Sequence, residues 1–159
     1  MSLLTEEIRA ALADKINPTK AVFLPKYFKA ITEGYGEGDF FMGVSVPDQR
    51  KFAKQFYKEI SLPELSELLK DRFHEVRLTA LLMLVYKYEK LKEDSGRKEL
   101  VEFYLAHLDG INNWDLVDSS CHKILGPYYF KRDKTLFYEF AESGNMIIRY
   151  FASRVELTQ

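Results

Sequence analysis

The stretch HEVRLTALLMLVYKY, from His74 to Tyr88, contains the longest apolar run of this 159-residue chain. That run, Leu78 to Tyr86, contains Thr79 and is too short to span a membrane. No part of the chain alternates apolar and polar residues over the length of a strand. We therefore predict that residues 74–88 form the central helix of an all-α fold.

Helical spacing and stop signals divide the rest of the sequence into further helices. Leu4, Ile8, Leu12 and Ile16 recur at helical intervals, and Asn17-Pro18 ends this first helix. Further helices are expected at 18–33 with a kink at Pro25, from Pro47, after Ser61, at 96–108 and from Trp114, with later breaks at Pro127, Asp133 and Gly144. A glycine-rich connection covers 34–47. Helix pairs at roughly thirty-to-forty-residue intervals predict an α-α superhelix, a HEAT-like or ARM-like solenoid of stacked helix pairs.

The amino-acid composition and the N-terminal residues indicate a folded protein without a secretory signal. Hydrophobic residues make up 47% of the chain, which argues against disorder, and the length suits a single domain, 1–159. Glu6 and Glu7 stand where a secretory signal would need basic and then apolar residues. We expect a cytoplasmic protein with no membrane segment, and we interpret residues 1–3 as a candidate remnant of expression.

Cysteine and histidine usage bears on redox and metal chemistry. Cys121 is the single cysteine, which excludes an internal disulfide and fits a reducing compartment. Although His122 follows it, neighbours on a helix point about 100° apart, which is a poor geometry for activating a thiol. His74, His107 and His122 lack ligand-type spacing, so no metal site is expected.

The charge of the chain is nearly balanced. The formal net charge is −1, so no overall field draws the chain onto nucleic acid. Basic residues nevertheless concentrate in the first third, at Lys20, Lys26, Lys29, Arg50, Lys51, Lys54 and Lys58. They indicate either a local basic surface or an ordinary solvated helix face.

The segment NNWDLVDSSCHKILG, from Asn112 to Gly126, carries the main functional signal. On a helix, Trp114 and Asp118 share one face, with the indole beside the carboxylate. A large aromatic next to an acid suits a flat or cationic ligand. The alternative is structural, because a lone Trp often anchors a core and an Asp near a helix start often caps it.

Four segments taken in order resemble the DNA glycosylases of the AlkD family, which are alkylation-repair enzymes built from HEAT repeats. They are NPTKAVFLPKYFKA from Asn17, YGEGDFFMGVSVPDQR ending at Arg50, HEVRLTALLMLVYKY from His74, and NNWDLVDSS from Asn112. The resemblance implies a curved shell of helix pairs that holds duplex DNA containing alkylated purines. It also implies excision of N3- or N7-alkylated purines by hydrolysis of the N-glycosidic bond, with no cofactor.

The resemblance also implies roles for individual residues. Asp118 matches the catalytic aspartate, and Trp114 matches the aromatic that lies against the damaged nucleotide. Tyr27 falls at another aromatic position of the cleft, and Arg50 and Arg149 match expected contacts to DNA phosphates. Structural alternatives stay open: Tyr27 could belong to the core, Arg50 could pair with Asp48 or Glu37, and Asp115 could cap or hydrogen-bond structurally.

The chain departs from the family near its end. Ile147 stands where the family has a Trp, and Tyr150 stands where it has a second arginine. Family members also continue for some further helices beyond Gln159. We therefore expect an uncovered apolar face at Phe151 and Val155, self-association through this C-terminal edge, weak DNA binding and impaired excision. The competing hypothesis is a non-catalytic HEAT-like scaffold that binds DNA or protein.

Overall fold

The computed structural model describes residues 2–27 and 39–157, and these residues form an all-α structure. Its helices are α1 (Leu3–Ala13), α2 (Pro18–Tyr27), α3 (Val46–Phe56), α4 (Leu62–Leu69), α5 (His74–Lys90), α6 (Asp94–Ala106), α7 (Trp114–Tyr129), α8 (Thr135–Ala141) and α9 (Met146–Leu157), with a short 3₁₀ turn at Leu108–Gly110. The described part contains no strand longer than one isolated bridge between Phe40 and Phe73. The all-α prediction is confirmed.

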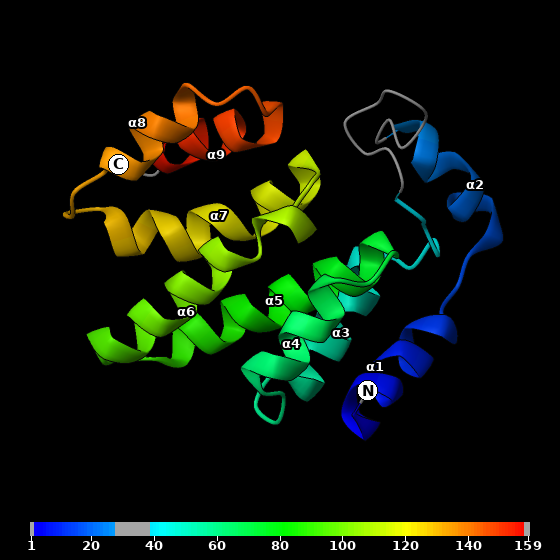
Figure 1. Cartoon of the computed structure of the whole chain (residues 1–159). Coiled ribbons are helices and arrows are strands. Elements are labelled where there is room, and N and C mark those ends of the chain that lie inside the picture. Colours follow the sequence, from blue (N-terminus) through cyan, green and yellow to red (C-terminus); the bar gives the residue numbers. More distant parts are fainter. Residues whose placement is uncertain (1, 28–38, 158–159) are drawn as a thin grey trace.

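The helices stack in pairs along the molecule. Helices α3, α5, α7 and α9 pack successively on one another, while α4, α6 and α8 each pack on the helix that follows them. Figure 1 shows this progression, from the blue α1 at one end to the orange and red α8 and α9 at the other. The result is the predicted helical-repeat fold. That the whole chain forms one domain remains a prediction.

Helix α5 is the central element, as its sequence predicts. Every side chain from His74 to Val85 is buried, and the helix packs against α3, α4 and α7. From Leu78 to Val85 the helix is apolar on all sides except at Thr79, and such a segment needs neighbours on all sides, which explains this position. No described helix is long and apolar enough to cross a lipid bilayer.

The expected break at Pro127 is wrong. Helix α7 continues through this proline to Tyr129. A proline inside a helix removes one backbone hydrogen bond and costs about 3 kcal/mol. Burial of Ile124, Leu125 and Tyr128 on the same helix offsets that cost, and the Arg132 guanidinium lies 3.9 Å from the centre of the Tyr128 ring. Tertiary packing therefore overrides the local stop signal.

The expected exposure of Phe151 and Val155 is also wrong. Their relative exposures are 0% and 1%, because α9 turns this face inward onto α7 and α8. The Phe151 ring meets Tyr104 edge-on, with ring centroids 6.0 Å apart. The prediction of self-association through an apolar C-terminal edge required these two residues to be exposed. Because both are buried, that prediction loses its structural basis.

The segment before α3 is held by a buried carboxylate at the start of α5. Glu75 is 1% exposed and accepts backbone N–H groups of Met42, Gly43 and Val44, at 3.0, 2.6 and 3.2 Å. Gly43 has a positive φ of 79°, and a Cβ there would lie 2.2 Å from the Asn17 carbonyl oxygen. Glycine is therefore required where this segment crosses the start of α2.

We predict that Glu75→Ala lowers the free energy of unfolding by about 3 kcal/mol, because three buried N–H groups lose their acceptor. Urea unfolding monitored by circular dichroism measures the change. Glu89→Ala, an exposed substitution on the same helix, serves as the control and should change stability by less than about 0.5 kcal/mol. Equal losses in both variants would show that the Glu75 contacts contribute no net stability.

Candidate active site

The first turn of α7 presents the two residues that the sequence singles out. Asn113 is fully buried and caps the helix, since its side-chain oxygen accepts the Asp115 backbone N–H at 2.9 Å. This cap fixes where the helix begins. Trp114 therefore occupies the first helical position, and Asp118 follows one turn later on the same side.

Trp114 is half-buried and lines a cavity of about 410 Å³ between α7 and α9. The other lining residues are Met146, Ile147, Arg149 and Tyr150. Trp114 is therefore placed at a hollow in the structure rather than fully inside the core. Since Ile147 is mostly covered and Arg149 is exposed, the hollow has an apolar wall and a cationic rim.

Asp118 bonds to Tyr150, which lines this hollow, and is held by two side chains of α9. The Tyr150 hydroxyl donates to Asp118 Oδ1 at 2.7 Å, and Arg154 Nε lies 2.7 Å from the same oxygen. Arg154 Nε also donates to the Tyr150 hydroxyl oxygen at 2.9 Å. The Asp118 side chain remains 31% exposed. Tyr150 therefore joins the Trp114 cavity to the carboxylate.

The protonation of these groups follows from their contacts. Burial and the hydrogen bond to Asp118 raise the pKa of Tyr150 above its ordinary value, so its phenol stays neutral and donates. Hydrogen bonds to Tyr150 and Asp118 raise the pKa of Arg154, so its guanidinium stays charged. The carboxylate thus faces one neutral donor and one cation.

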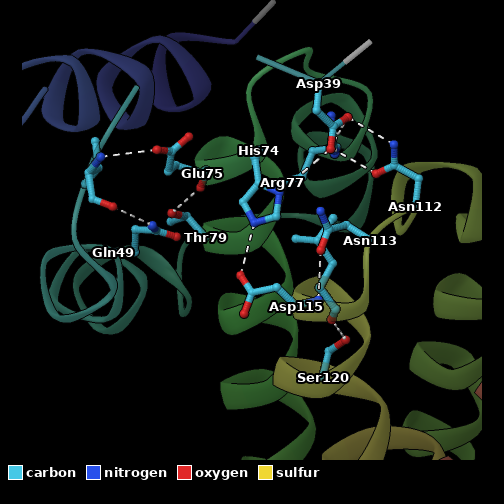
Figure 2. A network of polar contacts seen from close by, with 12 residues as sticks. Asp39, Gln49, His74, Glu75, Arg77, Thr79, Asn112, Asn113, Asp115 and Ser120 are labelled. Atoms are coloured by element: carbon cyan, nitrogen blue, oxygen red, sulfur yellow. Dashed lines mark hydrogen bonds and ion pairs between the residues drawn. The ribbon is translucent and has the colours of Figure 1, made fainter. Parts of the chain in front are cut away.

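A buried polar network lies behind this turn and ties it to α5 (Figure 2). His74 Nε2 donates to Asp115 Oδ2 at 3.1 Å, and His74 is 2% exposed. Arg77 pairs with Asp39 at 2.8 Å and donates to Asn112 Oδ1 at 3.0 Å. The structural alternative for Asp115 is therefore confirmed, because its partner is a histidine of the central helix.

Opposing effects set the charge of His74. Burial lowers the pKa of His74, but the contacts with Asp115 and Asp39 outweigh burial and raise it above the ordinary value. His74 Nδ1 lies 3.8 Å from Asp39 Oδ2, which is within ion-pair range but too long for a hydrogen bond. Burial raises the pKa of Asp39. The contacts with His74 and Arg77 lower this pKa by more than burial raises it, so the net shift is downward. The network therefore favours an imidazolium between two carboxylates.

The structure brings together three of the five residues expected at the site. Arg149 lines the cavity with Trp114 and donates to the Ser143 carbonyl oxygen at 2.6 Å, while Asp118 lies one step away through Tyr150. Arg50 is exposed on α3, which packs against α1 and α5 rather than α7.

Two of the structural alternatives concern Arg50 and Tyr27. Arg50 makes no ion pair with Asp48, while Glu37 lies outside the described residues. Tyr27 ends α2, and its side chain also lies outside the described part of the chain. Its role in a cleft or in the core therefore remains a prediction.

Sequence reasoning missed the partners of the site. The sequence pattern indicates Tyr150 only as the replacement of an arginine, not as a donor to Asp118, and it predicts no role for Arg154 at the site. Their separation of four residues on one helix was the available signal. No local sequence pattern predicts the ion pair between Asp39 and Arg77, because Asp39 lies in a loop and Arg77 lies on the central helix.

Other reactive groups do not add to this site. Cys121 is buried, and burial raises the pKa of its thiol to about 12, so it is an unreactive core residue. Within residues 2–27 and 39–157, no three His, Cys, Asp or Glu side chains are grouped so that they could bind a metal ion.

The chain matches the model of a known protein family. The family model described as "DNA alkylation repair enzyme" matches residues 8–157, which span nearly all of the helices described above. No curated protein and no solved structure matches the chain at a significant level.

We predict that the His74 network makes stability depend on pH. Because the folded pKa of His74 is raised, its contribution is fully present below its ordinary pKa of 6.5 and is lost as pH rises through the folded value. Because the folded pKa of Asp39 is lowered, its contribution is present above 3.8 and is lost as pH falls. Urea unfolding from about pH 5 to pH 9 should therefore show wild-type stability falling toward alkaline pH.

The His74→Gln variant is the comparison for this measurement. It should be less stable than the wild type at about pH 5.5 and should lose much of the alkaline slope. His122→Gln, at an exposed histidine of α7, should keep the wild-type slope. An unchanged slope in His74→Gln would show that other groups set the pH dependence.

Proposed function

The chain belongs to the family of DNA alkylation repair enzymes, and from this premise we propose that it is a DNA glycosylase of the AlkD type. It removes purines alkylated at N3 or N7 from duplex DNA by hydrolysing the N-glycosidic bond. The observation that carries the proposal is the link through Tyr150, which lines the cavity beside Trp114 and donates to Asp118. An aromatic surface and a partly exposed carboxylate therefore meet at one place.

The proposed substrate explains why a single carboxylate suffices. A purine alkylated at N3 or N7 carries a positive charge, so it leaves as a neutral base when it takes the electron pair of the glycosidic bond. The leaving base needs no general acid, whereas positive charge develops on the sugar. Asp118 stabilises that charge or positions the water that attacks the sugar carbon. The proton of this water is lost to solvent or to the carboxylate.

Trp114 supplies the complementary contact. The face of an indole attracts a cation, and the interaction is worth about 0.5–2 kcal/mol depending on desolvation. In the proposed complex the indole lies against the damaged nucleotide at the apolar hollow between α7 and α9. Lesion and sugar would then face Trp114 and Asp118 respectively, which are one helical turn apart.

DNA contacts are proposed at three further positions. Arg149 is exposed beside the cavity and suits a phosphate near the lesion. Arg50 on α3 and Tyr27 on α2 would contact the duplex farther from Trp114. With no cofactor required for hydrolysis, the proposed partner is duplex DNA containing alkylated purines, and the proposed location is the cytoplasm.

One observation favours the alternative, a non-catalytic helical scaffold that binds DNA or protein. The Arg154 guanidinium is paired with Asp118 at 2.7 Å and balances its negative charge. A carboxylate neutralised in this way stabilises a cationic sugar less well. In the glycosylase proposal Arg154 turns toward a DNA phosphate when the duplex binds, which frees Asp118. The scaffold proposal requires no such movement.

A base-release assay separates the two proposals. We predict that the protein releases N7- or N3-methylpurines from duplex DNA, at the reduced rate expected from Ile147 and Tyr150, and that Asp118→Asn slows release by a further factor of about 100 or more. The control is Asp14→Asn, which makes the same change at an exposed residue directly after α1. It should retain the wild-type rate. Equal DNA binding by all three proteins without release of base from any of them would support the scaffold instead.

We predict that Arg149→Gln weakens DNA binding and reduces the slope of log Kd against log salt concentration by about 1, because one phosphate contact is lost. Fluorescence anisotropy with a labelled duplex at several salt concentrations measures both quantities. Lys98→Gln removes a 63% exposed cation from α6 and should leave the slope unchanged. A slope that Arg149→Gln does not alter would place this arginine outside the DNA contact.

A further inference from the structure

A second cavity lies at the opposite end of the central helix from Trp114 and Asp118. Its volume is about 590 Å³, within the usual range for small-molecule sites. Its wall combines lysine, leucine and tyrosine side chains. Lys87 follows His74 by thirteen positions on α5, which corresponds to about 20 Å along the helix. None of the residues that line this cavity lines the hollow beside Trp114, so the two hollows are separate sites.

The charge around this second cavity is unbalanced. Lys58, Lys87 and Lys90 line it, and none of them forms an ion pair within 4.0 Å of an acidic side chain in the described part of the chain. Glu99 is the one acidic residue in the wall. Three cations, from the turn that follows α3 and from the last turns of α5, thus share one hollow with a single acid.

Lys87 shows that this arrangement destabilises a positive charge. It is half-buried, and burial lowers the pKa of its ammonium group, an effect that the more distant Glu64 only partly opposes. A charged group that is partly removed from water without a close counter-ion is destabilised. An anion bound in the cavity would supply the missing counter-charge.

The remaining walls are apolar and aromatic. Leu62, Leu91 and Leu100 contribute aliphatic surface. Tyr57 contributes its ring, which is braced edge-on by Tyr86 with centroids 5.7 Å apart. A fully hydrated inorganic ion would leave this surface without a partner, whereas a ligand with a flat apolar body would cover it.

We propose that this cavity binds a small aromatic anion of nucleotide size. The aromatic body of the ligand packs against Tyr57 and the leucines, and its phosphate lies among Lys58, Lys87 and Lys90. Charge complementarity selects the anion, and the apolar lining selects the aromatic body. Because the two cavities share no lining residue, the occupant of this one is distinct from the nucleotide that Trp114 would contact.

Titration with adenosine 5′-monophosphate, monitored by the amide signals of the isotope-labelled protein in NMR spectra, tests the proposal. We expect saturable shifts at residues 57–62 and 87–100. Adenosine and inorganic phosphate, tested separately, should each bind about tenfold or more weakly than the nucleotide, because each satisfies only one part of the cavity. Absence of saturable binding, or equal binding of phosphate alone, would overturn the proposal.

Two lysine variants test the site itself. Lys87→Met and Lys58→Met should each weaken binding of the nucleotide about tenfold, since each removes one charged contact to the phosphate. Lys98→Met, at an exposed lysine outside the cavity, is the matched control and should bind as the wild type does. Retained affinity in both cavity variants would overturn the proposal. Displacement of the nucleotide by undamaged duplex DNA would also overturn it, because the lysines would then belong to a DNA-binding face.

Discussion

Burying a charged side chain destabilises a protein unless a partner is supplied, and the first turn of α5 buries three ionisable side chains at once. Each of these three side chains bonds to a different part of the chain. Glu75 holds the backbone of residues 42–44, Arg77 pairs with Asp39, and His74 bonds to Asp115 on α7. Because α5 is enclosed by α3, α4 and α7, these contacts cannot be exchanged for water without opening the core. The central helix therefore organises both the segment before α3 and the start of α7.

The buried contacts of α5 also determine the geometry of the candidate site. Asp115 bonds to His74 on α5, whereas Asp118 and Trp114 point about 60° and 100° away from Asp115 around α7, toward α9. There Tyr150 and Arg154 meet Asp118, and Trp114 faces the hollow. The bond between the buried His74 and Asp115 thus fixes the turn of α7 that carries the partly exposed Trp114 and Asp118. The site is consequently sensitive to the core even though none of the buried network lines the cavity.

The ion pair between Asp118 and Arg154 is the point on which the functional proposals differ. In a glycosylase the carboxylate must face a developing cation, and a permanent guanidinium partner opposes this role. In a scaffold the same pair simply joins α7 to α9. Tyr150 makes the question specific to this chain, because a neutral phenol stands where the resemblance leads one to expect an arginine. The second cavity adds a region of positive charge that the repair chemistry does not require.

Local patterns in the sequence determined the helical class, the central position of residues 74–88 and the pairing of Trp114 with Asp118 on one face, because these depend on spacing along a single helix. The family also follows from ordered motifs in the sequence, in agreement with the matched family model. Tertiary structure decided the rest. Helix α7 passes through Pro127, and Phe151 and Val155 are covered, because packing outweighs local signals and short-range pattern cannot show what covers a face. The partners of Asp118 lie 32 or more residues away, and that of Arg77 comes from a loop before α3. Such contacts arise only when distant helices are brought together, since no local spacing encodes them.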